Sequence, residues 1–445
     1  MSEITTELLK KYQADYDQST GPKILSHAIA KQGYLDSIED NSVLRRHDFV
    51  FSDETKRGEI TNQKRSGRCW MFAALNTARV DTMKELNLES FEFSQNYTLF
   101  WDKLEKANYF LESIIKTVDE DLTSRLVMHL LKDPLQDGGQ WDMFSGILKK
   151  YGVVPKKVMP ETYHSSNTAV LDSLLTKKVR EIAKDIRNKH AEGASEDELR
   201  TFKEERLSVI YTMLTEALGQ VPTRFSYSYR DKDKKHHTIK DITPQEFFAK
   251  YVGWDLDQRI SLINAPTADK PYGRAYTVKY LGTVHEAEPI HYINVPIEVL
   301  KEAAINSIKA GEPVWFGCDV GQISNRQIGV MDKDLFDYEA AIGEPFNLNK
   351  AERLDYGESL LTHAMVFVGV DLDENGKPIK WKVENSWGDE PGDKGIFSMS
   401  DAWFDEFNYQ IMVDKSYVPA EWLKALEQPL VELEPWDPFG ALAVY

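Results

Sequence analysis

One cysteine of this chain lies where its thiol could act as a nucleophile. Cys69 follows Gly67-Arg68 and precedes the apolar run 70–75. A thiol attacks a carbonyl carbon as the thiolate, and free cysteine titrates near pH ~8.5. The first turn of a helix presents unpaired N–H groups and the positive end of the peptide dipoles, which both stabilise a thiolate. The pattern therefore predicts a helix over 69–86 that begins at its nucleophile, with Gly67 allowing a sharp turn before it.

A nucleophilic thiol needs a base, because most free cysteines are simply small buried side chains. Cys318 is of that kind: it lies in the strand-like apolar run 313–320, and we expect it in the core. His363 is the best candidate base. It stands in Thr362-His363-Ala364-Met365-Val366, at the mouth of a predicted strand, where a side chain is held rigidly and stays reachable.

A third residue can orient that base. Asn385 ends the next predicted strand, and the turn signal at 373–377, which contains Asn-Gly, joins the two strands as a hairpin. Paired strands would bring His363 and Asn385 side by side. The amide oxygen of Asn385 can then accept from one ring N–H, which fixes the tautomer and turns the other nitrogen toward the sulfur. Trp387 would shield that hydrogen bond from water.

The elements that position these residues change in kind along the chain. Helical patterns dominate as far as about residue 290, and Ser195 with Glu198 gives a capping-box signal within a charged helical block. Short β-branched or aromatic runs bounded by turn residues follow, at 290–295, 313–320, 364–370 and 379–383. Helices first and strands afterwards indicate an α+β fold rather than a doubly wound sheet.

These motifs together resemble the papain superfamily of cysteine peptidases. Gln63, Gly-x-Cys-Trp at 67–70, His363 and Asn-Ser-Trp-Gly at 385–388 occur in the order of that superfamily. Within it, the chain is similar to the bleomycin hydrolase and aminopeptidase C family. The segments that carry this closer resemblance are spread over the whole sequence, at 62–76, 137–141, 362–365 and 436–443.

The resemblance implies a fold, a reaction and a set of site residues. It implies a papain-like two-lobe fold, with a helical lobe, a β-barrel-like lobe, a large helical insertion and a C-terminal arm. Cys69 would attack the peptide bond, with His363 as its base and Asn385 orienting that base. Gln63 would donate to the oxyanion beside the backbone N–H of Cys69. The residues expected to contact the peptide substrate are Gly138, Gly139, Trp387, Ala443 and Tyr445. No cofactor is implied.

The sequence departs from the secreted papain pattern in two ways. Ser66 stands where that pattern has a cysteine, so the local disulfide is absent. Cys69 and His363 are also much farther apart than the usual ~130–150 residues. In the family such an insertion helps to build a ring-like homohexamer, and the same is implied here. The expected division is a helical lobe at 1–160, a helical insertion for oligomerisation at 161–290, a β-rich lobe at 291–415 and an arm at 416–445.

The C-terminal tail decides between two kinds of peptidase. In the family the terminal carboxylate lies in the cleft and meets the substrate's α-ammonium, and breaking such a pair costs about 2–5 kcal/mol. Here Phe439 replaces the family's Met, and Val444 and Tyr445 extend past Ala443, near which the family tail ends. We therefore expect a thiol aminopeptidase of broad specificity that trims these two residues. The alternative is an oligopeptidase or endopeptidase on the same scaffold, with the tail displaced.

Composition excludes several other classes. A formal charge of −18 over 445 residues opposes phosphate-backbone binding, so nucleic acid is not an expected partner. Two cysteines and a polar, acidic start indicate a cytoplasmic protein. The sequence shows no membrane-spanning stretch, no cluster with metal-ligand spacing and no Gly-rich phosphate loop. A cysteine-dependent acyltransferase would usually have an acid where Asn385 stands, and the complete Cys–His–Asn set disfavours a non-enzymatic scaffold.

Overall fold

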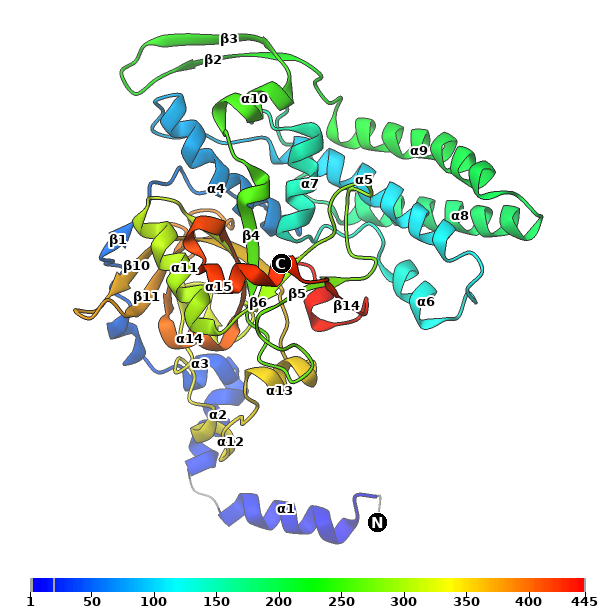
Figure 1. Ribbon diagram of the computed structural model, residues 1–445. Helices are drawn as coiled ribbons and strands as arrows, with labels where there is room; N and C mark the ends of the chain where they lie inside the picture. The colour runs from blue at the N-terminus through cyan, green and yellow to red at the C-terminus, as the bar shows by residue number, and fades with distance from the viewer. Residues whose placement is uncertain (1–2, 19–20, 444–445) are drawn as a thin grey trace.

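The structure is a computed structural model that describes residues 3–18 and 21–443. A broad sheet is surrounded by helices, and a group of long helices extends from one side of it (Figure 1). Within the described residues, no helix combines the length and the apolar character needed to cross a membrane.

The α-helices dominate the first half of the chain and also flank the strands of the second. Their bounds are α1 (Thr6–Gln18), α2 (Gly21–Gln32), α3 (Tyr34–Ile38), α4 (Cys69–Glu85), α5 (Gln95–Lys116), α6 (Arg125–Lys132), α7 (Trp141–Tyr151), α8 (Ala169–Ala191), α9 (Glu196–Leu218), α10 (Pro244–Tyr251), α11 (Ile297–Lys309), α12 (Tyr338–Ile342), α13 (Lys350–Asp355), α14 (Asp401–Phe407) and α15 (Ala420–Leu423).

Helix α4 holds the candidate nucleophile. It begins at Cys69, as the sequence predicted, and ends at Glu85, one residue before the predicted end. Its residues are buried on nearly every side, and it packs against the sheet at β7 and β10. A helix buried on nearly every side belongs to the protein interior. The thiol is therefore fixed at the buried start of a helix that cannot shift without disturbing the core.

Three long helices, α5, α8 and α9, pack against one another beside α4 and α7 (Figure 1). Helix α9 begins with the predicted capping box. The Ser195 hydroxyl accepts from the Glu198 backbone N–H, and the Glu198 carboxylate accepts from the Ser195 backbone N–H. This reciprocal cap satisfies two backbone donors at the start of the helix.

Most strands join one twelve-stranded sheet with the order β14-β5-β6-β4-β13-β7-β10-β11-β12-β9-β8, in which β1 pairs with β10 as a branch. Strands β2 and β3 form a separate hairpin. The strand bounds are β1 (Asp53–Glu54), β2 (Phe225–Arg230), β3 (His236–Ile242), β4 (Arg259–Ile263), β5 (Arg274–Val278), β6 (Tyr292–Asn294), β7 (Val314–Cys318), β8 (Ser324–Asn325), β9 (Val330–Met331), β10 (His363–Leu372), β11 (Pro378–Glu384), β12 (Ile396–Ser400), β13 (Asn408–Asp414) and β14 (Val431–Leu433).

The register of the central strands places the candidate base. Strands β10 and β11 form the predicted antiparallel hairpin, with Val366 opposite Glu384. On its other edge β10 pairs with β7, so that His363 lies directly opposite Cys318. Cys318 is fully buried, as expected for a core cysteine. The first residue of β10 and the residue after β11 therefore meet at one end of the sheet.

The expected change from helices to strands near residue 290 is wrong, because, apart from the two-residue β1, strands begin at Phe225. Strands β4 and β5 belong to the large sheet and precede that point. The β2–β3 hairpin is mostly exposed, and the charged segment 231–237 forms its turn and the start of β3. Because many of its residues are polar and exposed, this hairpin lacks the apolar run that indicated β6, β7, β10 and β11.

Candidate active site

Hydrogen bonds within the first turn and to a nearby side chain hold the start of α4 in place. The Cys69 side chain is buried, and the Arg68 carbonyl accepts from the N–H groups of Met71 and Phe72, which closes the first turn. The Gly67 N–H donates to Asp137 Oδ2 at 2.7 Å. These contacts fix the backbone on both sides of the sulfur.

His363 and Asn385 form the hydrogen bond that the hairpin predicted. His363 Nε2 lies 2.9 Å from Asn385 Oδ1, and both side chains are buried. The Ser386 backbone N–H also donates to this oxygen, at 2.8 Å, which fixes the orientation of the amide. Because an amide oxygen only accepts, Nε2 must carry the proton, which leaves Nδ1 as the basic nitrogen of the neutral ring. The Trp387 ring stacks on the imidazole, with centroids 4.8 Å apart.

Strand β7 connects the nucleophile helix to the base. Trp315 Nε1 donates to the Trp70 carbonyl at 3.0 Å, which joins the first turn of α4 to β7. Three residues further along β7, Cys318 lies opposite His363. Burial, and then the charges of Asp319 and Cys69, raise the pKa of Cys318 well above its usual value. Strand β7 therefore contacts the first turn of α4 through Trp315 and lies opposite His363 at Cys318, which stays a neutral thiol of the core.

Gln63 is held against the strand that carries Asn385. Its backbone N–H donates to the Ser386 carbonyl at 2.8 Å, and its Oε1 accepts from Ser386 Oγ at 2.7 Å. Its Nε2 donates to the Ser66 carbonyl at 2.7 Å. The amide nitrogen is thus directed to the loop before the nucleophile.

The C-terminal segment pairs with the glycine loop. The Gly139 N–H and carbonyl exchange two antiparallel hydrogen bonds with Ala443, each 3.3 Å long, and Ala443 is buried. The Trp70 indole packs so closely on Gly139 that a Cβ there would overlap the ring. The neighbouring Gly138 is held by its carbonyl oxygen, which accepts a hydrogen bond from Lys106 Nζ at 2.7 Å. The tail therefore occupies the backbone groups of Gly139 that an extended peptide would use. Tyr445 lies outside the described residues.

The tail is anchored upstream of Ala443 by several independent contacts. Gln140 Nε2 donates to the Ala441 carbonyl at 2.5 Å. Lys270 forms an ion pair of 2.8 Å with Asp437, and both side chains are largely buried. The Arg125 guanidinium lies 3.8 Å from the centre of the Trp436 ring. The arm is thus fixed to the body of the protein before it reaches the glycine loop.

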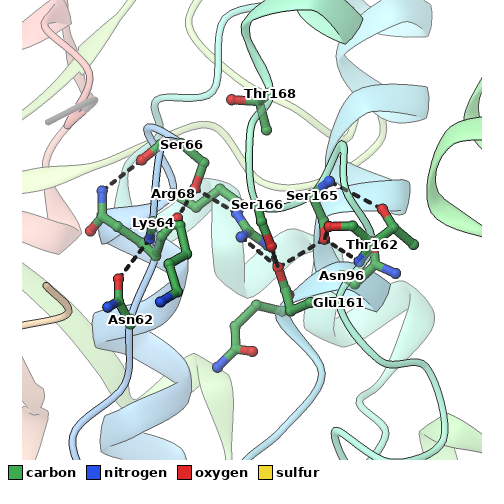
Figure 2. Close-up of polar contacts among 12 residues, drawn as sticks. Asn62, Lys64, Ser66, Arg68, Asn96, Glu161, Thr162, Ser165, Ser166 and Thr168 are labelled. Atoms are coloured by element: carbon green, nitrogen blue, oxygen red, sulfur yellow. Dashed lines mark hydrogen bonds and ion pairs between the residues drawn. The ribbon is translucent and has the colours of Figure 1, made fainter. Parts of the chain in front are cut away.

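A buried ion pair supports the residue that precedes the nucleophile. Figure 2 shows Arg68 forming two hydrogen bonds to Glu161, of 3.1 and 2.8 Å. Its Nε also donates to Ser66 Oγ, and Ser165 Oγ donates to Glu161. Although burial disfavours its charged form, Arg68 and Ser165 lower the pKa of Glu161. This network links the nucleophile loop to the segment that leads into α8.

A second charged cluster lies under the glycine loop. Lys103 is fully buried and forms ion pairs with Asp137 at 2.8 Å and Asp172 at 2.6 Å. Burial opposes ionisation of Asp137, but Lys103, Thr168 and the Gly67 N–H hold its pKa well below the usual range. Burial raises the pKa of Asp172 to about 7, because Lys103 offsets only part of that effect. Asp137 therefore stays charged and holds the Gly67 N–H.

The structure brings most of the predicted site residues together and adds others. Cys69, His363, Asn385, Gln63 and Trp387 lie around the start of α4 and the end of the β10–β11 hairpin, while Gly138, Gly139 and Ala443 lie at the neighbouring loop. Sequence reasoning missed Arg68, Glu161 and Lys103. Arg68 stands inside the Gly-x-Cys-Trp motif, but nothing in the sequence indicates its partner. No group of side chains suited to a metal ion is found among the described residues.

Comparisons with known proteins agree with this geometry. The model of the Peptidase C1-like family matches residues 3–440. The chain is 50% identical to Aminopeptidase C of Streptococcus thermophilus over 100% of both chains. It is 44% identical to Bleomycin hydrolase of Homo sapiens over 92% of each. The crystal structure of PepW from Lactobacillus rhamnosis HN001 is 48% identical and superposes with a TM-score of 0.97, covering 99% of this chain and 100% of that one.

Proposed function

Because the chain belongs to the Peptidase C1-like family and has a papain-like fold, we propose that it is a thiol aminopeptidase that removes amino-terminal residues from peptides. Relatives named Aminopeptidase C are 43–50% identical to it over at least 99% of its length. The observation that carries the proposal is the pairing of Ala443 with Gly139. With the protein's own tail at this position, a substrate can bind with its amino terminus next to the tail. A substrate chain that continued past this point would meet the tail.

In the proposed reaction Cys69 attacks the carbonyl carbon of the first peptide bond. Nδ1 of His363 takes the thiol proton and then gives it to the leaving amine, while Asn385 keeps Nε2 protonated and the ring in place. Gln63 and the backbone N–H of Cys69 donate to the oxyanion. One such donor is typically worth about 3–4 kcal/mol of transition-state stabilisation. Water then hydrolyses the acyl-enzyme.

The alternative is an oligopeptidase or endopeptidase. The reason to consider it is that the tail extends past Ala443. Val444 and Tyr445 follow the paired Ala443 in the sequence, and two residues can span at most about 7 Å. We propose that the enzyme removes them from its own tail. Intact-mass measurement of freshly purified wild type and of Cys69→Ser tests this: the wild type should lose both residues and the variant keep them. A fully active wild type that retains both would rule out trimming.

A substrate comparison tests the aminopeptidase proposal directly. The same fluorogenic peptide is offered with a free amino group and with an acetylated one, to the wild type and to Cys69→Ser. We expect cleavage of the free-amine peptide only, and loss of all cleavage in the variant. Rapid cleavage of the acetylated peptide would overturn the aminopeptidase assignment and favour the endopeptidase.

The remaining expectations concern larger-scale organisation. We propose a two-lobe division with a helical lobe at 1–160, an insertion at 161–290, a β-rich lobe at 291–415 and an arm at 416–445. We further propose that the insertion builds a homohexamer in the cytoplasm. Light scattering coupled to size-exclusion chromatography checks the assembly, since a mass of one or two chains would contradict it.

A further inference from the structure

A cavity of about 830 Å³ opens beside the candidate site on the side of Gln63 and Trp387. Its wall also includes Gly67, just before the nucleophile, and Arg326 from the turn after β8. The volume falls within the range of sites for small ligands, ~300–1,000 Å³. Gly139 and Ala443 do not line it. The cavity therefore lies on the side of Gln63 and Trp387, away from the paired tail.

The proposed reaction assigns this side to the leaving part of the peptide. His363 gives its proton to the departing amine, so that amine must pass beside the imidazole and the Trp387 ring stacked on it. Trp387 and Gln63 both line the cavity. Residues after the cut bond would continue into it, whereas the amino-terminal residue would face the tail. This inference rests on the aminopeptidase proposal.

The lining of the cavity carries unbalanced positive charge. Its cationic side chains are Lys64, Arg65, Lys177, Arg180 and Arg326, and its carboxylates are Asp133, Asp137 and Asp172. Two of those carboxylates, Asp137 and Asp172, are already paired with the buried Lys103 behind the wall. One lysine cannot neutralise two carboxylates, so at most one negative charge of this group and that of Asp133 face five cations. In a chain with a formal charge of −18, this excess is local to the cavity.

Arg326 is the cation best placed to bind an anion at the reacting end. Its guanidinium lies 4.1 Å from the centre of the Trp387 ring, which itself stacks on His363. Among the described residues it has no carboxylate within ion-pair distance, and its side chain is exposed. The turn that carries it is held by Asn325 Oδ1, which accepts from the N–H groups of Gln327 and Ile328. A planar guanidinium in a fixed position suits a bidentate carboxylate.

We propose that this cavity binds a carboxylate of the leaving part of the substrate, with Arg326 as the residue that recognises it. The carboxylate can be the free α-carboxylate of a dipeptide or the side chain of an acidic residue after the cut bond. Either source would make the enzyme prefer peptides with negative charge just beyond the first bond. An arylamide leaving group could not use this contact.

Matched dipeptides test the proposal. The pair Ala-Ala and Ala-Ala-amide differs only in the α-carboxylate, and the pair Ala-Glu-amide and Ala-Gln-amide differs only in a side-chain carboxylate. We expect the wild type to show a kcat/KM about fivefold higher for the charged member of at least one pair, the effect of roughly 1 kcal/mol for a partly exposed charge pair. Arg326→Gln should bring that ratio close to one. The pair that shows it identifies the source of the carboxylate.

Two further variants separate this contact from a general effect of charge. Arg326→Lys keeps the charge without the planar fork and should retain part of the ratio, while Arg45→Gln removes an exposed arginine outside the cavity and should retain all of it. Equal rates within both pairs for the wild type, or an unchanged ratio in Arg326→Gln, would overturn the inference and leave the aminopeptidase proposal standing. If the wild type cleaves none of the four free-amine dipeptides, the aminopeptidase proposal fails instead.

Discussion

Replacing Glu161 by glutamine should weaken both the fold and the proposed chemistry. Arg68 precedes Cys69 and is fully buried, and Glu161 accepts two of its hydrogen bonds. Glutamine keeps the size of the side chain but removes the charge, which leaves a buried guanidinium without a counter-charge. Removing one partner of a buried pair costs about 3–5 kcal/mol. Because the Glu161 side chain is 23% exposed, we expect a loss near the lower end, about 3 kcal/mol.

The pH dependence of this loss has a definite sign. The pKa of Glu161 is lowered in the folded protein, because Arg68 and Ser165 outweigh the effect of burial. A carboxyl of this kind contributes stability above its unfolded pKa of ~4.3, and that contribution disappears as the pH falls through the folded value. Urea unfolding of the wild type and of Glu161→Gln should therefore differ most near pH 7 and converge below pH ~4.

The same substitution should slow catalysis, because the backbone of Arg68 begins the turn that holds Cys69. We expect kcat/KM to fall at least about tenfold, since misplacing a reacting group by ~1 Å can cost a hundredfold. Glu112→Gln is the matched control, because Glu112 forms a buried pair with Lys203 between α5 and α9. It should lose comparable stability and keep its kcat/KM. If both variants lose activity equally, or if Glu161→Gln keeps its full stability at pH 7, the reasoning is refuted.

Gly139→Ala should abolish peptide cleavage and destabilise the protein by about 1–3 kcal/mol, because its Cβ would overlap the fully buried Trp70 ring. Activity assays and urea unfolding check this, and wild-type values would contradict it. Gln140→Ala removes a hydrogen bond from the tail and should raise cleavage of acetylated peptides relative to free-amine ones; an unchanged ratio would show that Gln140 does not hold the tail. The raised folded pKa of Asp172 makes the wild type lose stability as the pH rises from ~4 to 7, because the protonated carboxyl is the form that the fold favours. Asp172→Asn should make this fall less steep. Urea unfolding across this range checks the slope, and a slope equal to the wild type's would contradict it.

The parts of the site that lie close together in sequence could be predicted from it. Cys69 was placed at a helix start from the residues that flank it, and the contact of His363 with Asn385 followed from one hairpin turn. A tail that lies along the cleft was expected only through the family resemblance, and the pairing of Ala443 with Gly139 was not predicted, because no local pattern joins the end of a chain to a distant loop.

The parts that sequence reasoning missed depend on charges that meet across long separations. Arg68 and Glu161 are 93 residues apart, and each reads as an ordinary exposed side chain until the fold buries it. Lys103 lies in a helix with a polar surface pattern, yet it is fully buried against two carboxylates. Arg326 has no signal at all, since its position beside Trp387 depends on two separate turns of the sheet edge. Which charged side chains become buried depends on how the helices and the sheet pack together, and the periodicity of a short segment does not predict it.

The anchoring of the tail determines how its two extra residues can be accommodated. Gln140 holds Ala441 and Gly139 holds Ala443, so the register of the arm is fixed at two neighbouring points. Sliding the arm by one residue or by two would break the hydrogen bonds at Ala441 and Ala443 and detach Asp437 from Lys270. A shift of two residues would bring the end of the chain to the position of Ala443, but only by breaking these contacts. The proposed removal of Val444 and Tyr445 would keep every one of these contacts, which is why we favour trimming over a displaced tail.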